Sequence, residues 1–135
     1  MKYDVIIVGA GPAGIFAAME LKKIDANCKI LILEKGSPIE KRICPKRNTN
    51  KCYGCSPCNI TTGFAGAGAY SDGKLSLSPD VGGILPQYIG YEQTRELIDY
   101  VDKIYLEFGA DRKVYGNEHP EKIEAIRRKA IESNL

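Results

Sequence analysis

Asp4-Val-Ile-Ile-Val-Gly-Ala-Gly-Pro-Ala-Gly14 joins a short apolar run to three glycines spaced as G-x-G-x-x-G. The run from Val5 to Val8 is long enough for one buried strand, and residues 15–24 carry apolar side chains at helical spacing. Strand, glycine turn and helix, in this order, are the context in which the motif indicates dinucleotide binding.

Each glycine of the motif has a separate physical task. Gly9 lets the chain reverse sharply, Gly11 leaves room for a pyrophosphate against the backbone, and Gly14 lets the helix pack closely on the strand. Pro12 suits the first helical turn because its missing N–H would have no partner there. The N–H groups and the positive dipole end of the helix then face the phosphates.

A second apolar run ends in an acid at the spacing that such folds require. Residues 29–33 read Lys-Ile-Leu-Ile-Leu and are followed by Glu34, about twenty residues beyond the motif. A carboxylate there accepts hydrogen bonds from ribose hydroxyls and repels a 2′-phosphate. A βαβ unit without a ligand would not explain why the glycines and the acid are both in register, so the sequence predicts a dinucleotide site.

The stretch that begins at Asp4 resembles the opening of flavoproteins with two dinucleotide-binding domains, in which the first βαβ unit binds the ADP half of FAD. The resemblance implies an FAD-dependent oxidoreductase, a dehydrogenase or reductase, with NAD(P)H as a candidate electron donor. It places five residues at the pyrophosphate and one on the adenosine ribose: Gly9, Gly11, Pro12, Ala13 and Gly14, and then Glu34.

The predicted fold is α/β: a Rossmann-like FAD/NAD(P)-binding domain with a parallel sheet and flanking helices, incomplete and with extra C-terminal helices. The chain has 135 residues, one domain's worth of sequence. The family's second FAD motif, a late strand ending in Gly-Asp, is not found in it. Residues 1–135 therefore resemble the N-terminal FAD-binding part of a larger flavoenzyme, whose missing C-terminal part or second subunit would be the partner.

Composition argues against several other classes of protein. Hydrophobic residues make up 44% of the chain and charged residues 27%, and the formal net charge of +2 gives no reason to expect a nucleic-acid partner. No window holds the unbroken apolar run of a membrane span. The apolar N-terminus is assigned to a strand rather than to a signal peptide. We therefore expect a cytoplasmic protein that acts on a small molecule the sequence does not identify.

A loop insertion at residues 44–58 contains Cys44, Cys52, Cys55 and Cys58, of which the last three are spaced C-x-x-C-x-x-C. This spacing lets successive sulfurs point at one centre, and a cytosolic chain argues against structural disulfides. The four cysteines could have no joint role, and three functional interpretations stay open as well. They are a Zn²⁺ ion held by four thiolates, an iron–sulfur cluster, and a redox-active dithiol near the flavin.

Two further segments supply candidate FAD contacts. Lys35 and Arg42 follow the second strand, where related flavoproteins often place a basic residue near the adenosine, although a solvated basic surface is the plain alternative. Gly66-Ala-Gly-Ala-Tyr-Ser-Asp-Gly-Lys-Leu75 resembles an FAD-contacting loop of uncharacterised FAD-dependent dehydrogenases. That resemblance implies four residues near the flavin or its phosphates: Ser71, Asp72, Gly73 and Lys74.

The remaining chain, residues 91–135, is predicted to be a helical segment. Residues 92–108 carry one apolar stripe and are followed by Gly109 at the position of a C-terminal cap. Residues 120–133 form a second predicted helix. Val114 and Tyr115 are predicted as a short strand, and residues 78–90 as a turn-rich connector.

Two other functions compete with the FAD-dependent oxidoreductase. One is a non-catalytic nucleotide-binding module or subunit whose cysteine loop holds a metal, and the other is an enzyme that binds NAD directly at the glycine turn. The N-terminal position of the motif and its Gly-Pro-Ala-Gly sequence favour FAD over NAD. No catalytic acid or base can be named, because His119 is the only histidine and is interpreted as a helix-start residue.

Overall fold

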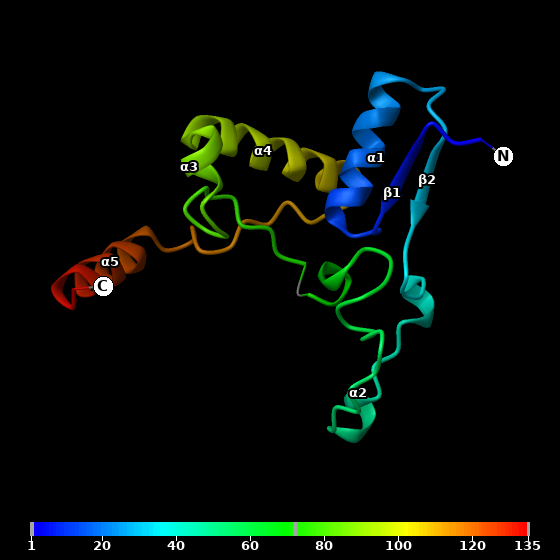
Figure 1. Ribbon diagram of the computed structural model, residues 1–135. Helices are drawn as coiled ribbons and strands as arrows, with labels where there is room; N and C mark the ends of the chain where they lie inside the picture. The colour runs from blue at the N-terminus through cyan, green and yellow to red at the C-terminus, as the bar shows by residue number, and fades with distance from the viewer. Residues whose placement is uncertain (1, 72, 135) are drawn as a thin grey trace. The chain divides into compact units, whose positions relative to one another are not determined.

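The computed structural model describes residues 2–71 and 73–134 (Figure 1). The chain divides into two compact units, Met1–Lys74 and Leu75–Leu135. The first unit contains β1 (Val5–Val8), α1 (Pro12–Ile24), β2 (Ile30–Leu33), the 3-10 helix η1 (Ile39–Lys41), α2 (Lys46–Thr49) and the 3-10 helix η2 (Ala67–Tyr70). The second contains α3 (Leu85–Ile89), α4 (Tyr91–Glu107) and α5 (Pro120–Glu132).

The first unit is built on a βαβ crossover, which confirms the predicted strand, helix and strand. β1 and β2 are parallel neighbours, with Val5 opposite Ile30 and Val8 opposite Leu33. Parallel strands need a long crossover, and α1 supplies it. β2 begins at Ile30, one residue later than the run 29–33, because the Asp4 carboxylate accepts the Lys29 N–H at 2.8 Å in place of a strand carbonyl.

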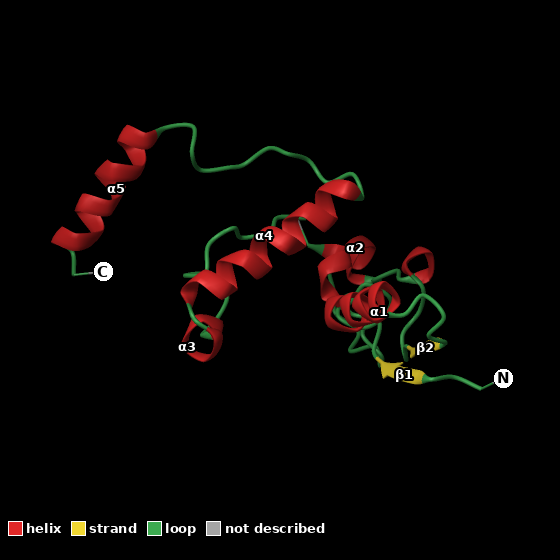
Figure 2. Cartoon of the chain, turned by 90° about the horizontal axis from the view of Figure 1, so that it is seen from above, coloured by secondary structure: helices red, strands yellow, loops and turns green. Residues whose placement is uncertain are grey.

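The sheet has one covered and one open face. Figure 2 shows α1 on one side of the strand pair. Val5 and Ile7 are half-buried, whereas Ile6 and Val8 on the other face are 58% and 85% exposed. Because parallel sheets are normally covered on both faces, this two-stranded sheet is a small and incomplete form of the Rossmann-like fold, as the sequence predicted.

The longest helix of the second unit is α4, and Ile104 on its apolar stripe is buried. The helix ends at Glu107, and Gly109 follows it with a φ of +93°, as predicted for a C-terminal cap. The Gly109 N–H donates to the Leu106 carbonyl and the Ala110 N–H to that of Tyr105. The predicted connector at residues 78–90 contains α3, a short helix that the sequence analysis missed because its prolines and glycines resemble a loop. Its Pro86 lies in the first turn, where a missing N–H is tolerated.

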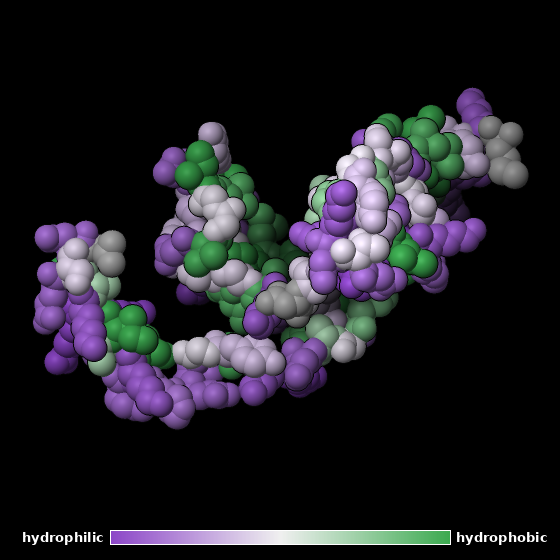
Figure 3. All heavy atoms as spheres, turned by 90° about the horizontal axis from the view of Figure 1, so that it is seen from below, coloured by the Kyte–Doolittle hydropathy of each residue, from purple (hydrophilic) through white to green (hydrophobic). Residues whose placement is uncertain are grey.

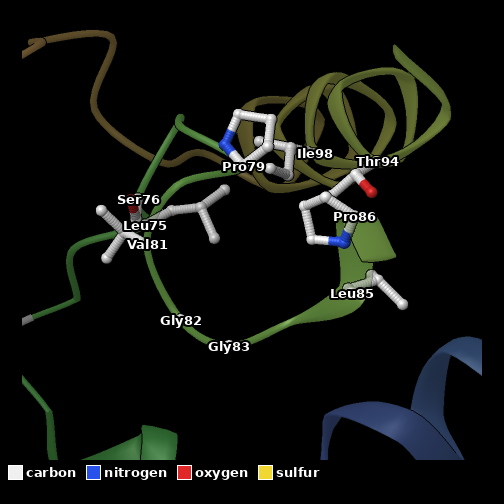
Figure 4. Close-up of a pocket in the computed structure, with 10 residues that line it drawn as sticks. All are labelled: Leu75, Ser76, Pro79, Val81, Gly82, Gly83, Leu85, Pro86, Thr94 and Ile98. Carbon is white, nitrogen blue, oxygen red and sulfur yellow. The ribbon is translucent and has the colours of Figure 1, made fainter. Parts of the chain in front are cut away.

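A mostly apolar cavity of about 250 Å³ lies in this second unit. Figure 4 shows the side chains around it, which come from the segment before α3, from α3 itself and from α4. They include Leu75, Pro79, Val81, Leu85 and Ile98.

The predicted strand at Val114 and Tyr115 is wrong. Residues 111–114 have no regular secondary structure, and β1 and β2 are the strands of the sheet within the described residues. A strand needs a neighbour with which to pair. Here Lys113 instead lies over the Tyr115 ring at 4.9 Å from its centroid.

Apolar side chains reach the surface in both units (Figure 3). The most exposed include Val8 at 85%, Ile24 at 84% and Phe108 at 79%. Among the helices in the described part of the chain, none has both the length and the apolar character needed to cross a lipid bilayer.

Candidate dinucleotide-binding site

The glycine turn joins β1 to α1, and the start of the helix lies close against the strand and the turn. Gly9 has a φ of +103°, which favours glycine, and its N–H donates to the Leu33 carbonyl at 2.7 Å. A Cβ added at Gly14 would lie 2.1 Å from the Gly9 carbonyl oxygen and 3.2 Å from Ile7 Cγ2. The close packing of helix on strand predicted for Gly14 is therefore present.

Gly11 faces open space, unlike Gly14. A Cβ added there would meet nothing within 4 Å, and Gly11 immediately precedes the first residue of α1. Pro12 and Ala13, in the first helical turn, are exposed. Bare backbone beside a helix N-terminus suits a phosphate group, so these residues fit the diphosphate of a dinucleotide.

Glu34 stands beside the same turn, at the end of β2. Its Oε2 accepts the Ala10 N–H at 2.8 Å, and its Oε1 accepts the Gly36 N–H at 2.8 Å. These N–H groups, first Ala10 and then Gly36, lower the pKa of the Glu34 carboxyl, and the Lys35 charge adds to the effect. A carboxylate has about four lone-pair sites, so the ionised group retains capacity for ribose hydroxyls.

Acid should weaken the fold through Glu34. Its pKa in the folded protein lies below the ordinary glutamate value of about 4.3, so its stabilisation is complete above that value and is lost as the pH falls through the lowered pKa. Glu34→Gln has no titrating group at this position. Between about pH 5 and pH 3 its free energy of unfolding should therefore fall less than that of the wild type. Urea unfolding of both proteins at several pH values checks this, and parallel pH profiles would contradict it.

Residues 59–66, here called the covering segment, lie against the glycine turn. The Ala65 N–H donates to the Ala10 carbonyl at 2.8 Å, and the Phe64 N–H donates to the Ser37 carbonyl at 3.2 Å. A Cβ added at Gly66 would lie 3.4 Å from Gly11 Cα. The covering segment therefore borders the open space at Gly11.

Arg42 holds the covering segment in place through hydrogen bonds from its guanidinium to backbone carbonyls of the segment. Its side chain is 2% exposed, and its ring partner is Tyr70, whose centroid lies 4.9 Å from Arg42 Cζ. Nε donates to the Asn59 carbonyl at 2.9 Å, Nη2 to that of Ile60 at 2.6 Å, and Nη1 to those of Phe64 and Gly66 at 2.8 Å each. Sequence reasoning selected Arg42 as an FAD contact but missed this role, because its four carbonyl partners lie 17 to 24 positions away along the chain. Its predicted FAD contact stays a prediction.

Gly63→Ala should destabilise the first unit by about 2 kcal/mol or more. Gly63 has a φ of +133°, and an added Cβ would lie 2.6 Å from both Arg42 Cδ and the Ser37 carbonyl oxygen. Gly68→Ala is the matched control, because a Cβ at Gly68 meets nothing within 4 Å. Urea unfolding followed by circular dichroism measures both variants, and equal midpoints would refute the expectation.

The other predicted FAD contacts lie at the surface. Lys35 is exposed, and so are Ser71, Gly73 and Lys74. Ser71 Oγ donates to the Gly68 carbonyl at 2.9 Å and accepts the Gly73 N–H at 3.1 Å, which folds this loop on itself. Asp72 lies outside the described residues. Contacts between these residues and FAD stay predictions.

The cysteines of the loop insertion are free thiols, half-buried at Cys44 and exposed at Cys52, Cys55 and Cys58. Within the described residues, no three His, Cys, Asp or Glu side chains are grouped so as to hold a metal ion. The N–H groups of Thr61 and then Ile60 lower the pKa of the Cys58 thiol. Zinc, an iron–sulfur cluster and a redox dithiol therefore stay predictions, which elemental analysis and absorbance of anaerobically purified protein would separate.

Known proteins resemble this chain over short stretches. The electron transfer flavoprotein-ubiquinone oxidoreductase of Oryza sativa subsp. japonica is 49% identical over 43 residues, 29% of this chain and 8% of the relative. The protein of that name in Pseudomonas aeruginosa is 45% identical over 47 residues, 32% of this chain and 8% of the relative. An uncharacterized protein of Clostridium beijerinckii is 37% identical over 80 residues, 56% of this chain and 14% of the relative.

The chain thus covers only a small part of the length of these relatives. No solved structure matches it significantly. A family model described as pyridine nucleotide-disulphide oxidoreductase matches residues 3–131, which include the glycine turn, Glu34 and the covering segment. By this match the chain belongs to the pyridine nucleotide-disulphide oxidoreductase family.

Proposed function

We propose that this chain is the FAD-binding portion of a flavin-dependent oxidoreductase, with the ADP half of FAD at the glycine turn and Glu34. The observation that carries the proposal is the open space at Gly11, together with the Glu34 carboxylate on the N–H of the preceding residue, Ala10. The backbone at Gly11 and the first turn of α1 would accept the pyrophosphate, while Glu34 would accept hydrogen bonds from the ribose. Bound FAD would supply the redox chemistry.

The names of the relatives support flavin binding but do not point to a particular substrate. Two of them are named electron transfer flavoprotein-ubiquinone oxidoreductases, and their matched stretches amount to 8% of each protein. We therefore propose that a further segment or a second subunit carries the small-molecule substrate site, with NAD(P)H as the electron donor. We also propose a cytoplasmic location for this activity.

Competition between nucleotides tests the proposed binding mode. FAD is titrated into the purified chain and followed by quenching of flavin fluorescence, and ADP, FMN and 2′-phospho-ADP are then added as competitors. ADP should displace FAD because it carries the pyrophosphate and the ribose. FMN should not, since it lacks adenosine, and 2′-phospho-ADP should compete less well than ADP because Glu34 repels its extra phosphate. Displacement by FMN but not by ADP would overturn the proposal.

A further inference from the structure

We propose that Arg42 is a positioning residue of the cofactor site, which acts through the covering segment in place of the direct FAD contact that the sequence predicted for it. The buried guanidinium fixes residues 59–66 against the glycine turn, and the covering segment forms one wall of the space for the pyrophosphate. The inference rests on the proposed function and deepens it, because it names the device that sets the width of that space.

The chemistry of the guanidinium suits this role. All four of its acceptors are backbone carbonyls, drawn from both ends of the covering segment. Arginine presents five donors in a rigid planar fork, so one side chain can fix several carbonyls at once. Because a buried charge is costly without compensation, the carbonyl dipoles and the guanidinium hold each other in place.

The hydrogen bonds of Arg42 matter for the cofactor site because the covering segment lies against the glycine turn. The Arg42 bonds to Phe64 and Gly66 flank Ala65, whose N–H reaches the Ala10 carbonyl at 2.8 Å. Ala65 has a φ of +66°, a conformation that alanine keeps only where its surroundings hold it. Gly66 lies beside Gly11, so a shift of the covering segment would alter the space where the diphosphate is expected.

A neighbouring arginine provides a matched control. Arg47 lies over the same Tyr70 ring, with Cζ at 4.8 Å from the centroid, but its side chain is exposed. Tyr70 also donates its hydroxyl to the Arg42 carbonyl. Replacing Arg47 removes a positive charge and a ring contact and leaves the four carbonyl bonds of Arg42 intact.

The experiment compares Arg42→Met, Arg42→Lys and Arg47→Met in the full chain. FAD affinity is measured by titration, and amide hydrogen exchange is measured in the same proteins without FAD. Both Arg42 variants should bind FAD more than about tenfold more weakly, while Arg47→Met should stay within about twofold of the wild type. Exchange should rise at Phe64, Ala65 and Gly66 in the Arg42 variants, with protection in β1 and α1 retained.

The lysine variant separates positioning from direct contact. Lysine keeps the charge but presents it at a single point, and it cannot bridge four carbonyls. Wild-type affinity in Arg42→Lys would mean that the site needs only a positive charge, and it would overturn the proposal. Weaker binding without faster exchange at residues 64–66 would indicate direct contact and would overturn it as well.

A milder variant guards against global unfolding in Arg42→Met. Tyr70→Phe removes the hydroxyl bond to the Arg42 carbonyl and keeps the ring over the guanidinium. It should raise exchange at residues 64–66 and weaken FAD binding by less than the Arg42 variants do. Unchanged exchange and unchanged affinity in Tyr70→Phe and both Arg42 variants would overturn the inference alone. A wild-type chain that binds no FAD would overturn the proposed function instead.

Discussion

Gly14→Ala is expected to destabilise the first unit by about 3 kcal/mol or more, a large part of the stability of a small domain. The added Cβ would lie 2.1 Å from the Gly9 carbonyl oxygen, and both groups belong to backbone that the βαβ crossover fixes. Helix propensity acts in the opposite direction, because alanine is favoured over glycine by about 1 kcal/mol within a helix. The steric term is the larger, so the clash decides the sign.

Gly11→Ala is the matched control for this prediction. It adds the same methyl group to the same turn, where nothing lies within 4 Å, so its free energy of unfolding should change by no more than about 1 kcal/mol. Urea unfolding followed by circular dichroism measures both proteins. A Gly14→Ala protein as stable as Gly11→Ala would show that α1 can move away from β1, against the packing described above.

Gly11→Val should weaken FAD binding severely and leave the protein folded. The added Cβ would meet nothing within 4 Å in the chain itself, so we expect the fold to tolerate the change, but the valine side chain would fill the space where the diphosphate meets the backbone. We expect FAD affinity to fall by about a hundredfold or more, which corresponds to about 3 kcal/mol. Fluorescence titration with FAD measures the loss, and urea unfolding shows whether the fold is retained.

Ala17→Val serves as the control for added bulk on the same helix. Ala17 is an exposed position of α1, beyond its first turn, so the variant should bind FAD as the wild type does. Retention of FAD by Gly11→Val would count directly against the proposed site. Loss of FAD in both variants would point to a general disturbance of α1 rather than to an occupied pyrophosphate space.

The parts of the structure that could be predicted depend on local patterns. The glycine spacing fixed the turn between β1 and α1, and the number of residues before Glu34 placed its carboxylate beside Ala10, because paired parallel strands end at the same edge. Gly109 was likewise predictable, since the end of an apolar stripe followed by glycine indicates a helix cap.

The parts that could not be predicted depend on contacts between distant residues. Arg42 bonds residues 17 to 24 positions away, so its place after the second strand suggested an FAD contact but not a role in holding the covering segment. The strand expected at Val114 and Tyr115 had the right residue types, but the described residues place no strand beside it with which to pair. Folding brings distant carbonyl groups to Arg42, whereas it brings no strand to residues 114–115 within the described part of the chain.

The bonds from Ala10 and Gly36 to Glu34 also bear on how a sugar would be recognised. They restrict the rotation of the carboxylate as soon as the two strands and the turn have formed. An arriving ribose would therefore meet an acceptor that is already oriented, and the loss of side-chain freedom that accompanies binding would fall mainly on the cofactor. In this sense the acid is preorganised by the backbone that it helps to hold.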